Sequence, residues 1–277
     1  MSTAISVYHG AFGRAAIYHL DRPLTLHAHR EGHLVFYIDR STGVLTVNGA
    51  PQRCDAARAV AVNPWEVHNF QPSTPGAGTI CLVLYIRPQW FTRHGAAGGA
   101  STLRFGRSEI PLDAEMLKLV DLVAHRLQKA GEDEEFDHGL FALTNACYCA
   151  SVVPGNTLHD QTPAAPSLSD FRIRKSIQIM QSQLSTQLDM DGVARESGLS
   201  RPHFFKLFRL QTGLTPHLYM NTLRVETAIN MVTGTERSVT DIGLDLGFSS
   251  QSSFTRFFSL NVGLPPTDYR RVAQVAA

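Results

Sequence analysis

Residues 242–269 have the sequence IGLDLGFSSQSSFTRFFSLNVGLPPTDY, and residues 193–219 have the related sequence VARESGLSRPHFFKLFRLQTGLTPHLY. Each copy predicts a short helix, a glycine-containing turn and a longer helix opened by serine, which is the layout of a helix-turn-helix. Serine suits a helix start because its hydroxyl can satisfy an otherwise unpaired amide. With one extra residue in the second turn, the matched pairs are Gly198 with Gly247, Leu199 with Phe248, Phe204 with Phe254, Phe208 with Phe258, Gly213 with Gly263, Leu214 with Leu264, Pro216 with Pro266 and Tyr219 with Tyr269.

The longer helix of the second copy carries small polar side chains on the face opposite its phenylalanines. These side chains belong to Gln251, Ser252, Thr255 and Arg256. Arginine can bond guanine through two hydrogen bonds, glutamine suits adenine, and serine and threonine are short enough to allow close approach. We therefore expect these four residues to contact DNA bases in the major groove.

The matching face of the first copy is formed by Arg201, Pro202, Phe205 and Lys206, with Arg209 one turn later. We expect this face to contact DNA as well, and Arg209 to approach a phosphate. An outward Phe205 has two interpretations: it contacts a thymine methyl or a sugar, or it turns into the small helical core. Any one of these polar residues could also be ordinary solvent-facing surface.

The segment between the copies, TPHLYMNTLRVETAINMVTGT (residues 215–235), predicts one connecting helix. Thr215 suits the N-cap, Pro216 the first helical position, and Gly234 the end. Leu218, Val225, Ala228 and Val232 follow helical spacing. About eighteen residues at ~1.5 Å each give roughly 27 Å. With the turns added, this helix could hold the two DNA-contacting helices about one DNA turn (~34 Å) apart.

These residues resemble the DNA-binding domain of the AraC/XylS family of bacterial transcription regulators, over about residues 168–271. The closest match is SVTDIGLDLGFSSQSSFTRFFSLNVGLPPTDYR (residues 238–270), with its Gly-Phe turn, serine-rich helix start and closing Pro-x-x-Tyr-Arg. Gly243 departs from the family, which usually has alanine there, and should loosen its helix slightly. The resemblance implies double-stranded promoter DNA, a second copy of the chain and RNA polymerase as partners.

The chain upstream of residue 168 has a different pattern. Short apolar runs such as HLVFYI and TICLVLYI, broken by glycine, proline and asparagine, predict strands up to about Trp90. Residues 112–131 then predict a helix with Leu117, Val120, Val123 (or Ala124) and Leu127 on one face, which we expect to form a dimer contact. A second helix is expected within residues 136–153. A stretch rich in proline, serine and threonine follows and predicts a linker.

Together these patterns predict an α+β chain of two domains. The N-terminal part resembles a cupin-like β-barrel with dimerisation helices, and the C-terminal part is expected to be an all-α domain with two helix-turn-helix units joined by a linker helix. The expected boundaries are 1–100 for the effector-binding barrel, 101–152 for the dimerisation or packing helices, 153–168 for the linker and 169–277 for the DNA-binding domain, with helix-turn-helix units at about 191–212 and 239–262.

Histidines gather in the part that resembles a cupin-like effector domain, LTLHAHREGHLVFYIDRSTGVLTVNG (residues 24–49) followed by AVAVNPWEVHNFQP (residues 59–72). We expect His27, His29, His33 and His68 to line an effector pocket. Residues two apart on a strand face the same side, so a metal site of His27, His29, Glu31 or His33, and His68 is an alternative. A purely structural role is a third interpretation.

Bulk properties set the remaining expectations. The net charge is +1, but residues 168–277 hold 12 Lys and Arg against 9 Asp and Glu, whereas the rest holds 25 − 12 = 13 against 24 − 9 = 15. The four cysteines have no spacing typical of zinc fingers or disulfide frameworks. Neither a secretory signal nor a membrane-spanning run is apparent, which favours a cytoplasmic protein with no membrane partner.

Three functional hypotheses remain open from the sequence. The leading one is a transcription regulator controlled by a small-molecule effector in the barrel, with no catalytic residue and no cofactor. The second is a metal-dependent cupin enzyme that carries the same DNA-binding domain, and the third is a metal-sensing regulator.

Overall fold

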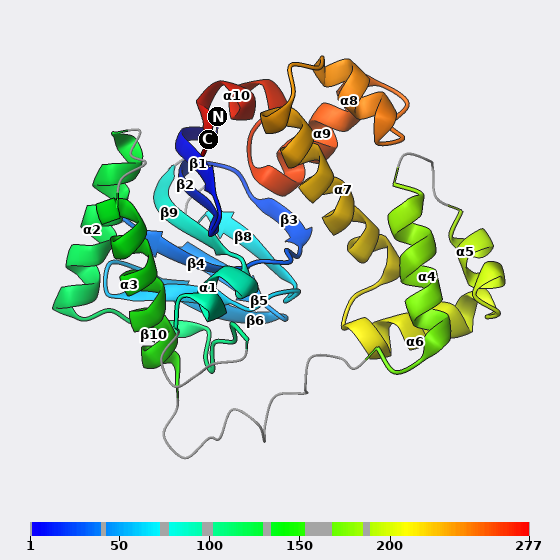
Figure 1. Ribbon diagram of the computed structural model, residues 1–277, viewed down its shortest axis with the longest axis horizontal. Helices are drawn as coiled ribbons and strands as arrows, with labels where there is room; N and C mark the ends of the chain where they lie inside the picture. Colours follow the sequence, from blue (N-terminus) through cyan, green and yellow to red (C-terminus); the bar gives the residue numbers. More distant parts are fainter. Residues whose placement is uncertain are drawn as a thin grey trace.

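The computed structural model describes residues 2–39, 43–72, 78–95, 102–129, 134–152, 168–184 and 189–276. β-strands form the N-terminal part of the chain and helices form most of the C-terminal part (Figure 1). The predicted α+β class is therefore confirmed. Most of the predicted linker, residues 153–167, lies outside the described residues.

Two sheets build the N-terminal part. The larger has the strand order β10-β7-β4-β9-β2-β1-β11 and the smaller has the order β3-β8-β5-β6. All of the strand pairs are antiparallel except β1 with β11, which is parallel. The strands are β1 (Thr3–Gly10), β2 (Gly13–Leu20), β3 (Leu24–His27), β4 (Gly32–Tyr37), β5 (Gly43–Val47), β6 (Ala50–Cys54), β7 (Arg58–Val62), β8 (His68–Pro72), β9 (Thr79–Ile86), β10 (Glu109–Pro111) and β11 (Ala273–Val275).

The central strands of the larger sheet are buried on both faces. In β4, Leu34 and Phe36 pack in one apolar cluster with residues of the N-terminal helices, whereas Val35 and Tyr37 pack in a second cluster with residues of the smaller sheet. Alternate side chains of a strand point to opposite faces, so both faces of this strand must be apolar. The near-continuous apolar run HLVFYI follows from this double burial.

The larger sheet packs against three helices, α1 (Pro88–Arg93), α2 (Ala114–Gln128) and α3 (Glu134–Ser151). Val120, Val123 and Leu127 of α2 are buried against the sheet and α3, but Leu117 is 39% exposed. Leu117 therefore lies off the predicted stripe, and Val120, Val123 and Leu127 are covered within the same chain, whereas a dimer contact through this helix stays a prediction. The predicted helical region also contains a strand, β10, which pairs with β7.

The C-terminal helices are α4 (Phe171–Ser182), α5 (Met190–Glu196), α6 (Arg201–Thr212), α7 (Pro216–Gly234), α8 (Val239–Asp245), α9 (Gln251–Val262) and α10 (Pro266–Val272). Both copies of the repeat form a short helix followed by a longer one, α5 with α6 and α8 with α9. Their turn glycines, Gly198 and Gly247, have φ values of 72° and 79°, and Gly213 and Gly263 end the longer helices at 76° and 96°. Only glycine adopts such angles without strain, so the glycines recur where the fold needs them.

Helix α7 connects the two units, as the sequence predicts. The Thr215 hydroxyl accepts a hydrogen bond from the Leu218 amide, Pro216 occupies the first turn, and Gly234 is the last helical residue. The 19 residues of α7 give it a length of about 28 Å at ~1.5 Å per residue. In Figure 1, α7 runs from the α8–α9 unit to the α4–α6 unit.

The C-terminal part is not purely helical and does not stand apart from the barrel. Its last described residues form β11, which pairs in parallel with β1 at the edge of the larger sheet. The apolar core of the second helix-turn-helix continues into the core between the sheets, with Val262, Leu264 and Tyr269 packed beside Val7 and Leu20. The expectation of an all-α C-terminal domain is therefore wrong at its end, where the tail completes an open sheet edge.

The four cysteines are free thiols; Cys54, Cys81 and Cys147 are buried and Cys149 is exposed. Among the described residues, no helix is long and apolar enough to cross a membrane.

Candidate functional site

The longer helix of the second copy, α9, has the buried and exposed faces that the sequence predicts. Phe254 and Phe258 are fully buried, whereas Gln251, Ser252 and Arg256 are exposed and Thr255 is half-buried. Ser250 and Ser253 form a reciprocal capping box at the helix start. The Gln251 side-chain oxygen accepts a hydrogen bond from Thr240 in α8 (2.9 Å), which holds this amide at the start of the outward face.

The corresponding face of α6 is also open to solvent. Arg201, Pro202, Lys206 and Arg209 are exposed, whereas Phe205 is half-buried at the edge of the helical core, with its ring 5.7 Å from those of Phe204 and His217. Of the two interpretations of Phe205, the structure favours the turn toward the core. Arg201 pairs with Asp191 of α5 (3.1 Å), and Ser200, unlike Ser250, makes no side-chain cap bond.

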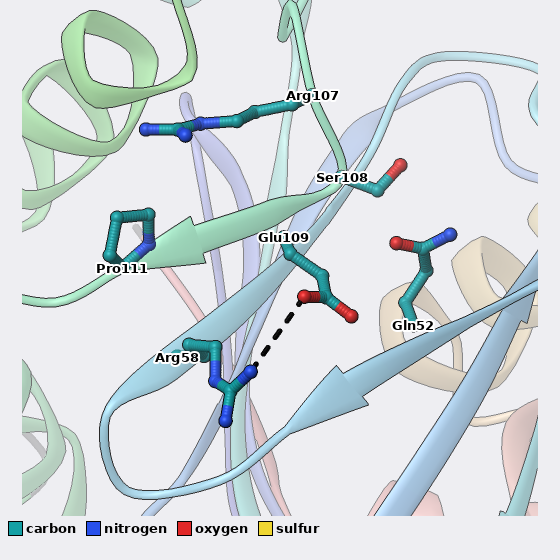
Figure 2. A pocket seen from close by; sticks show the side chains of 6 residues that line it. All are labelled: Gln52, Arg58, Arg107, Ser108, Glu109 and Pro111. Carbon is teal, nitrogen blue, oxygen red and sulfur yellow. Dashed lines mark ion pairs between the residues drawn. The ribbon is translucent and has the colours of Figure 1, made fainter.

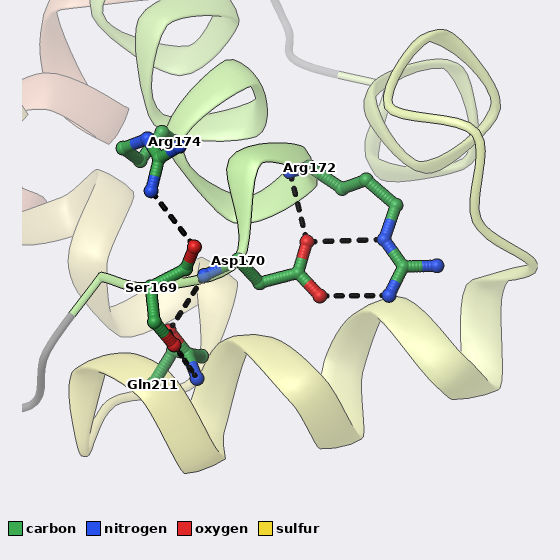
Figure 3. A network of polar contacts seen from close by, with 5 residues as sticks. All are labelled: Ser169, Asp170, Arg172, Arg174 and Gln211. Atoms are coloured by element: carbon green, nitrogen blue, oxygen red, sulfur yellow. Dashed lines mark hydrogen bonds and ion pairs between the residues drawn. The ribbon is translucent and has the colours of Figure 1, made fainter.

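A polar network joins the start of α4 to the end of α6 (Figure 3). Asp170 caps α4 through the Arg172 amide and also binds both the Nε (3.0 Å) and Nη2 (2.7 Å) of the Arg172 guanidinium. These bonds from Arg172 lower the pKa of Asp170 to about 2. The Gln211 carbonyl accepts hydrogen bonds from Ser169 and from the Asp170 amide, and Arg174 donates to two carbonyls before α4. The network therefore fastens α6 to the first helix of the DNA-binding region.

The four predicted pocket histidines lie together where the smaller sheet meets the larger. His27 and His68 face each other across the β3–β8 pair, with ring centroids 4.2 Å apart, and His33 of β4 lies 4.4 Å from His68. His29 follows β3 and packs 4.9 Å from His27 and 5.3 Å from His68. All four side chains are 3–6% exposed. We name these four residues the histidine cluster.

Burial sets the charge of the histidine cluster. It lowers the pKa of His27 to about 4 and that of His33 to about 3, and it holds the pKa values of His29 and His68 well below the usual range. All four rings are therefore neutral near pH 7. The Nδ1 atoms of His27 and His68 each contact the carbonyl of the residue two positions earlier, at 2.6 and 2.8 Å. A neutral ring must donate there, so Nδ1 carries the proton and Nε2 carries the lone pair.

Three of these histidines could hold a metal ion. One ligand atom from each of His27, His29 and His68 lies within 4.8 Å of the other two. Glu31, which the sequence offered as an alternative ligand, is not part of this group. β3 ends at His27, so the strand alternation that favoured Glu31 does not extend to it.

A row of polar side chains crosses the larger sheet beside the histidine cluster, and sequence reasoning missed most of it. His33 pairs with Tyr85 of β9, Tyr85 with Arg14 of β2, and Arg14 with His9 of β1. Arg14 is 7% exposed, and its guanidinium carbon lies 3.7 Å from the centroid of the Tyr85 ring. The sequence signal for this row was the arginine within the apolar run of β2, because arginine is almost never fully buried unless it is paired.

Tyr269 of α10 joins this row from the DNA-binding region. Its hydroxyl accepts a hydrogen bond from Arg14 Nη1 (3.3 Å) and lies 2.9 Å from His9 Nε2. Burial, together with the nearby guanidinium charges, lowers the pKa of His9 to about 3, so the neutral ring can accept the hydroxyl proton. The fully buried Tyr269 therefore fastens the second helix-turn-helix to the barrel.

Tyr219, the repeat partner of Tyr269, fastens α7 to the barrel. Its ring stacks on Trp65 with centroids 5.0 Å apart and planes 7° apart. The Trp65 amide donates to the carbonyl of His29 (2.7 Å), and Thr222 donates to the carbonyl of Ala28 (3.2 Å). The segment that carries His27 and His29 is thus in direct contact with the DNA-binding region.

An ion pair adds to the contact between the barrel and α7. Glu226 accepts hydrogen bonds from the Arg30 amide (3.2 Å) and from its Nε (2.9 Å). Burial raises the pKa of Glu226 to about 7 despite the opposing charge of Arg30. This carboxyl therefore titrates near neutral pH.

A separate pocket of about 490 Å³ lies at the start of β7 (Figure 2). It is lined by Gln52, Arg58, Arg107, Ser108, Glu109 and Pro111. Arg58 pairs with Asp55 (2.9 Å) and approaches Glu109 (3.9 Å), and Glu109 also accepts a bond from the Arg53 amide. Arg107 donates to the Ala150 carbonyl. Since its charged groups already have partners within the chain, this pocket is a weaker effector site than the histidine cluster.

Residues 193–272 match the family of helix-turn-helix domains. The HTH-type transcriptional activator RhaS of Escherichia coli (strain SMS-3-5) is 23% identical over 250 residues, which cover 88% of this chain and 86% of RhaS. The probable transcriptional regulator LumQ of Photobacterium leiognathi is 25% identical over 60% of this chain and 64% of LumQ. YobQ, an HTH-type regulator of Bacillus subtilis, is 28% identical over 68% of this chain and 74% of YobQ.

Solved structures of similar fold cover nearly the whole chain. ToxT of Vibrio cholerae in its apo form aligns with a TM-score of 0.59 at 12% identity, over 95% of this chain and 98% of ToxT. Wild-type ToxT bound to an unsaturated fatty acid aligns with a TM-score of 0.55 at 13% identity, over 93% of this chain and 94% of ToxT. The combination of an N-terminal β part with two C-terminal helix-turn-helix units is therefore shared across both chains.

The similar sequences distinguish the transcription-regulator hypothesis from the enzyme hypothesis. RhaS, LumQ and YobQ are transcription regulators, and none of the three is named as an enzyme. The metal-dependent enzyme is therefore unsupported, and a transcription regulator is the reading that the chain and its relatives share.

Proposed function

We propose that the chain is a transcription regulator of the AraC/XylS family and that a small effector bound at the histidine cluster controls how its DNA-binding region is held. The helix-turn-helix match over residues 193–272 and the similarity to RhaS support this assignment. Helix α9 contacts the DNA bases through Gln251, Ser252, Thr255 and Arg256. The α6 face, formed by Arg201, Pro202, Lys206 and Arg209, contacts the neighbouring groove segment and its phosphates.

One observation carries this proposal: the segment that bears His27 and His29 also contacts the DNA-binding region. Ala28, between the two histidines, accepts the hydrogen bond of Thr222 in α7. A ligand that shifts or fixes the two histidines therefore acts directly on the helix that spaces the two DNA-contacting units. The fatty acid bound by ToxT supports the idea that a chain of this fold can take a small ligand.

The mechanism is a change in docking. Tyr219 and Tyr269 attach the connecting helix and the second helix-turn-helix to the barrel. An effector that favours one docked arrangement shifts the population toward it by its differential affinity for the two states. The arrangement then decides whether both DNA-contacting helices can occupy their groove segments together, which multiplies affinity when geometry allows it.

The proposal includes a cytoplasmic homodimer that contacts RNA polymerase. The activator named RhaS supports a polymerase contact. The inner stripe of α2 is covered within the chain, so a dimer would use the outer face of that helix, where Leu117 is exposed.

The test is a thermal-shift screen of metabolites and ions on the full chain, followed by operator binding with each compound that raises the melting temperature. We expect at least one compound both to stabilise the protein and to change operator affinity. In Tyr269→Phe the same compound should still bind but should change operator affinity less, because one docking contact is lost. Compounds that stabilise the protein and leave operator affinity unchanged in every case would refute control by the barrel.

A further inference from the structure

We propose that the effector is a divalent transition-metal ion of the kind that imidazole binds, held by His27, His29 and His68. This inference rests on the proposed function, because it names the ligand class of the same site. Zinc, nickel, copper and iron are the ions that suit all-imidazole sites.

The spacing of the three side chains fits one ion. Their ligand atoms lie within 4.8 Å of one another. Zn–N bonds of about 2.0–2.1 Å in a tetrahedron place the nitrogen atoms about 3.4 Å apart. Small inward shifts of the rings therefore complete the site.

Two of the ligands are already oriented for an ion. His27 and His68 donate from Nδ1 to the carbonyls of Thr25 and Glu66, in the same arrangement two residues apart. This is the outer hydrogen bond that metal-ligating histidines usually make, and it leaves Nε2 as the free ligand atom. The Nε2 atoms of His29 and His68 and the Nδ1 of His33 are buried and have no hydrogen-bond partner among the described residues. Buried polar atoms normally have a partner, and an ion would supply it.

The packing of the histidine cluster favours an ion over an organic molecule. The rings of the cluster lie 4.2–5.4 Å from one another, and His29 and His33 also contact the ring of Tyr85 at 5.1 and 5.3 Å. Neighbouring rings at such distances leave room for an ion between their nitrogen atoms and little more.

The charge of Arg14 distinguishes a metal ion from an anionic organic effector. Its guanidinium lies against Tyr85, and Tyr85 contacts His29 and His33. The buried charge of Arg14, on the far side of the Tyr85 ring, repels a metal ion at the three histidines. Arg14→Gln should therefore bind the metal ion more tightly, whereas an anionic organic effector would lose affinity in the same variant.

The contacts on this segment connect the ion to the DNA-binding region. Thr25 donates to the carbonyl of Leu260 at the end of α9 (3.0 Å), and Ala28 accepts from Thr222 of α7. The carbonyl of His29 accepts from Trp65, which stacks on Tyr219. Trp65 holds a φ of 66°, which is unfavourable for a bulky residue, so the surroundings of Trp65 hold it there. Coordination of His27 and His29 thus constrains three points of contact at once.

Metal binding is tested on the full chain after removal of bound metal with a chelator. Titration with Co²⁺, followed by its visible absorption, should show one equivalent bound in a tetrahedral nitrogen environment, and Zn²⁺ should displace it. His27→Gln and His68→Gln should weaken Co²⁺ binding by at least about a hundredfold, because removing a ligand costs more than removing an outer partner. His125→Gln, at an exposed position of α2, is the matched control and should bind like the wild type.

Circular dichroism shows whether each variant is folded. If the histidine variants do not fold, X-ray absorption of the Co²⁺-loaded wild type decides instead, and at least three imidazole ligands are expected. Failure of the folded wild type to bind an equivalent of Co²⁺ or Zn²⁺, or fewer than three imidazole ligands, overturns the inference. So does unchanged binding by folded His27→Gln and His68→Gln.

Operator binding then separates this inference from the proposed function. Zn²⁺ should change the operator affinity of the wild type about tenfold or more, and Trp65→Leu should bind Zn²⁺ normally while showing a smaller change. If only a metabolite acts on the metal-free protein, the metal inference is overturned and control by the barrel stands. If neither metal ions nor metabolites change operator affinity, both are overturned.

Discussion

Arg256 lies exposed on α9, on the face opposite the buried Phe254 and Phe258. We predict that Arg256→Ala weakens binding to the specific site by about 1–3 kcal/mol and relaxes the preference at one base pair, because a guanidinium can bond guanine through two hydrogen bonds. Titration of the specific site and of its single-base variants with the purified protein measures both effects.

Lys206→Ala is the matched comparison on α6, where the side chain is also exposed. A phosphate contact carries no sequence information, so its loss should weaken specific and random DNA alike and reduce the salt dependence by about one unit of slope. Equal losses on specific and random DNA for Arg256→Ala would contradict its assigned base contact.

At the residue scale, sequence patterns located the histidines but not their neighbours. The His-x-His spacing and the later His68 predicted one pocket, and these residues do lie together. Arg14 and Tyr269 are 255 positions apart and meet only because the DNA-binding region docks on the barrel. No local pattern predicts such a pair, because its cause is the packing of two distant segments.

At the scale of elements, Gly243 shows how closely two helices of the second unit pack. A Cβ added to Gly243 would lie 2.9 Å from the Cβ of Phe254, so glycine lets α8 approach α9 closely. Helix propensity alone predicted only a looser helix. In the first copy the matching position is Ala194.

We predict that Gly243→Ala destabilises the protein by about 1–2 kcal/mol. Alanine gains up to about 1 kcal/mol of helix propensity. The contact with the Cβ of Phe254, which no side-chain rotation can move away, costs more, on the scale of about 1–3 kcal/mol for overpacking. Urea unfolding measures the change. Gly234→Ala is the control, because a Cβ there meets nothing within 4 Å and should be neutral or mildly stabilising; equal stabilisation by both variants would contradict the close approach.

The repeat predicted the helical elements well because its glycines and caps are local signals. Each turn needs a left-handed residue, and the starts of α5, α8 and α9 each have a side chain that bonds a free amide. β11 had no such signal. Its three residues form a strand only because the edge of β1 offers unpaired backbone groups.

At the scale of the whole molecule, docking should depend on pH through Glu226. Burial raises its pKa to about 7 in the docked protein, above the ordinary 4.5. A carboxyl with a raised pKa stabilises the docked state below its ordinary pKa, and that contribution is lost as pH rises through 7. We therefore predict weaker docking at pH 8 than at pH 5.5, by roughly 2 kcal/mol.

Glu226→Gln should remove most of this pH dependence, because its side chain does not titrate. Fluorescence energy transfer between labels on the barrel and on α6 measures docking across the pH range. Glu236→Gln, at an exposed position, is the control and should keep the wild-type dependence. An unchanged pH profile in Glu226→Gln would show that another group is responsible.

The sequence predicted two parts joined by a linker, but the docking of these two parts on each other could not be predicted from the sequence. Apolar residues of the second helix-turn-helix looked like an internal core, and their contacts with the barrel depend on how two surfaces fit. Shape complementarity between distant segments has no periodic signature along the chain.

We expect α6 and α9, spaced by α7, to contact two successive major-groove segments. A hydroxyl-radical footprint of the full chain on its selected operator tests this most directly. We predict two protected segments on one face of the duplex, with centres about one helical turn (~34 Å) apart. A single protected segment, or two segments on opposite faces of the duplex, would contradict the claim.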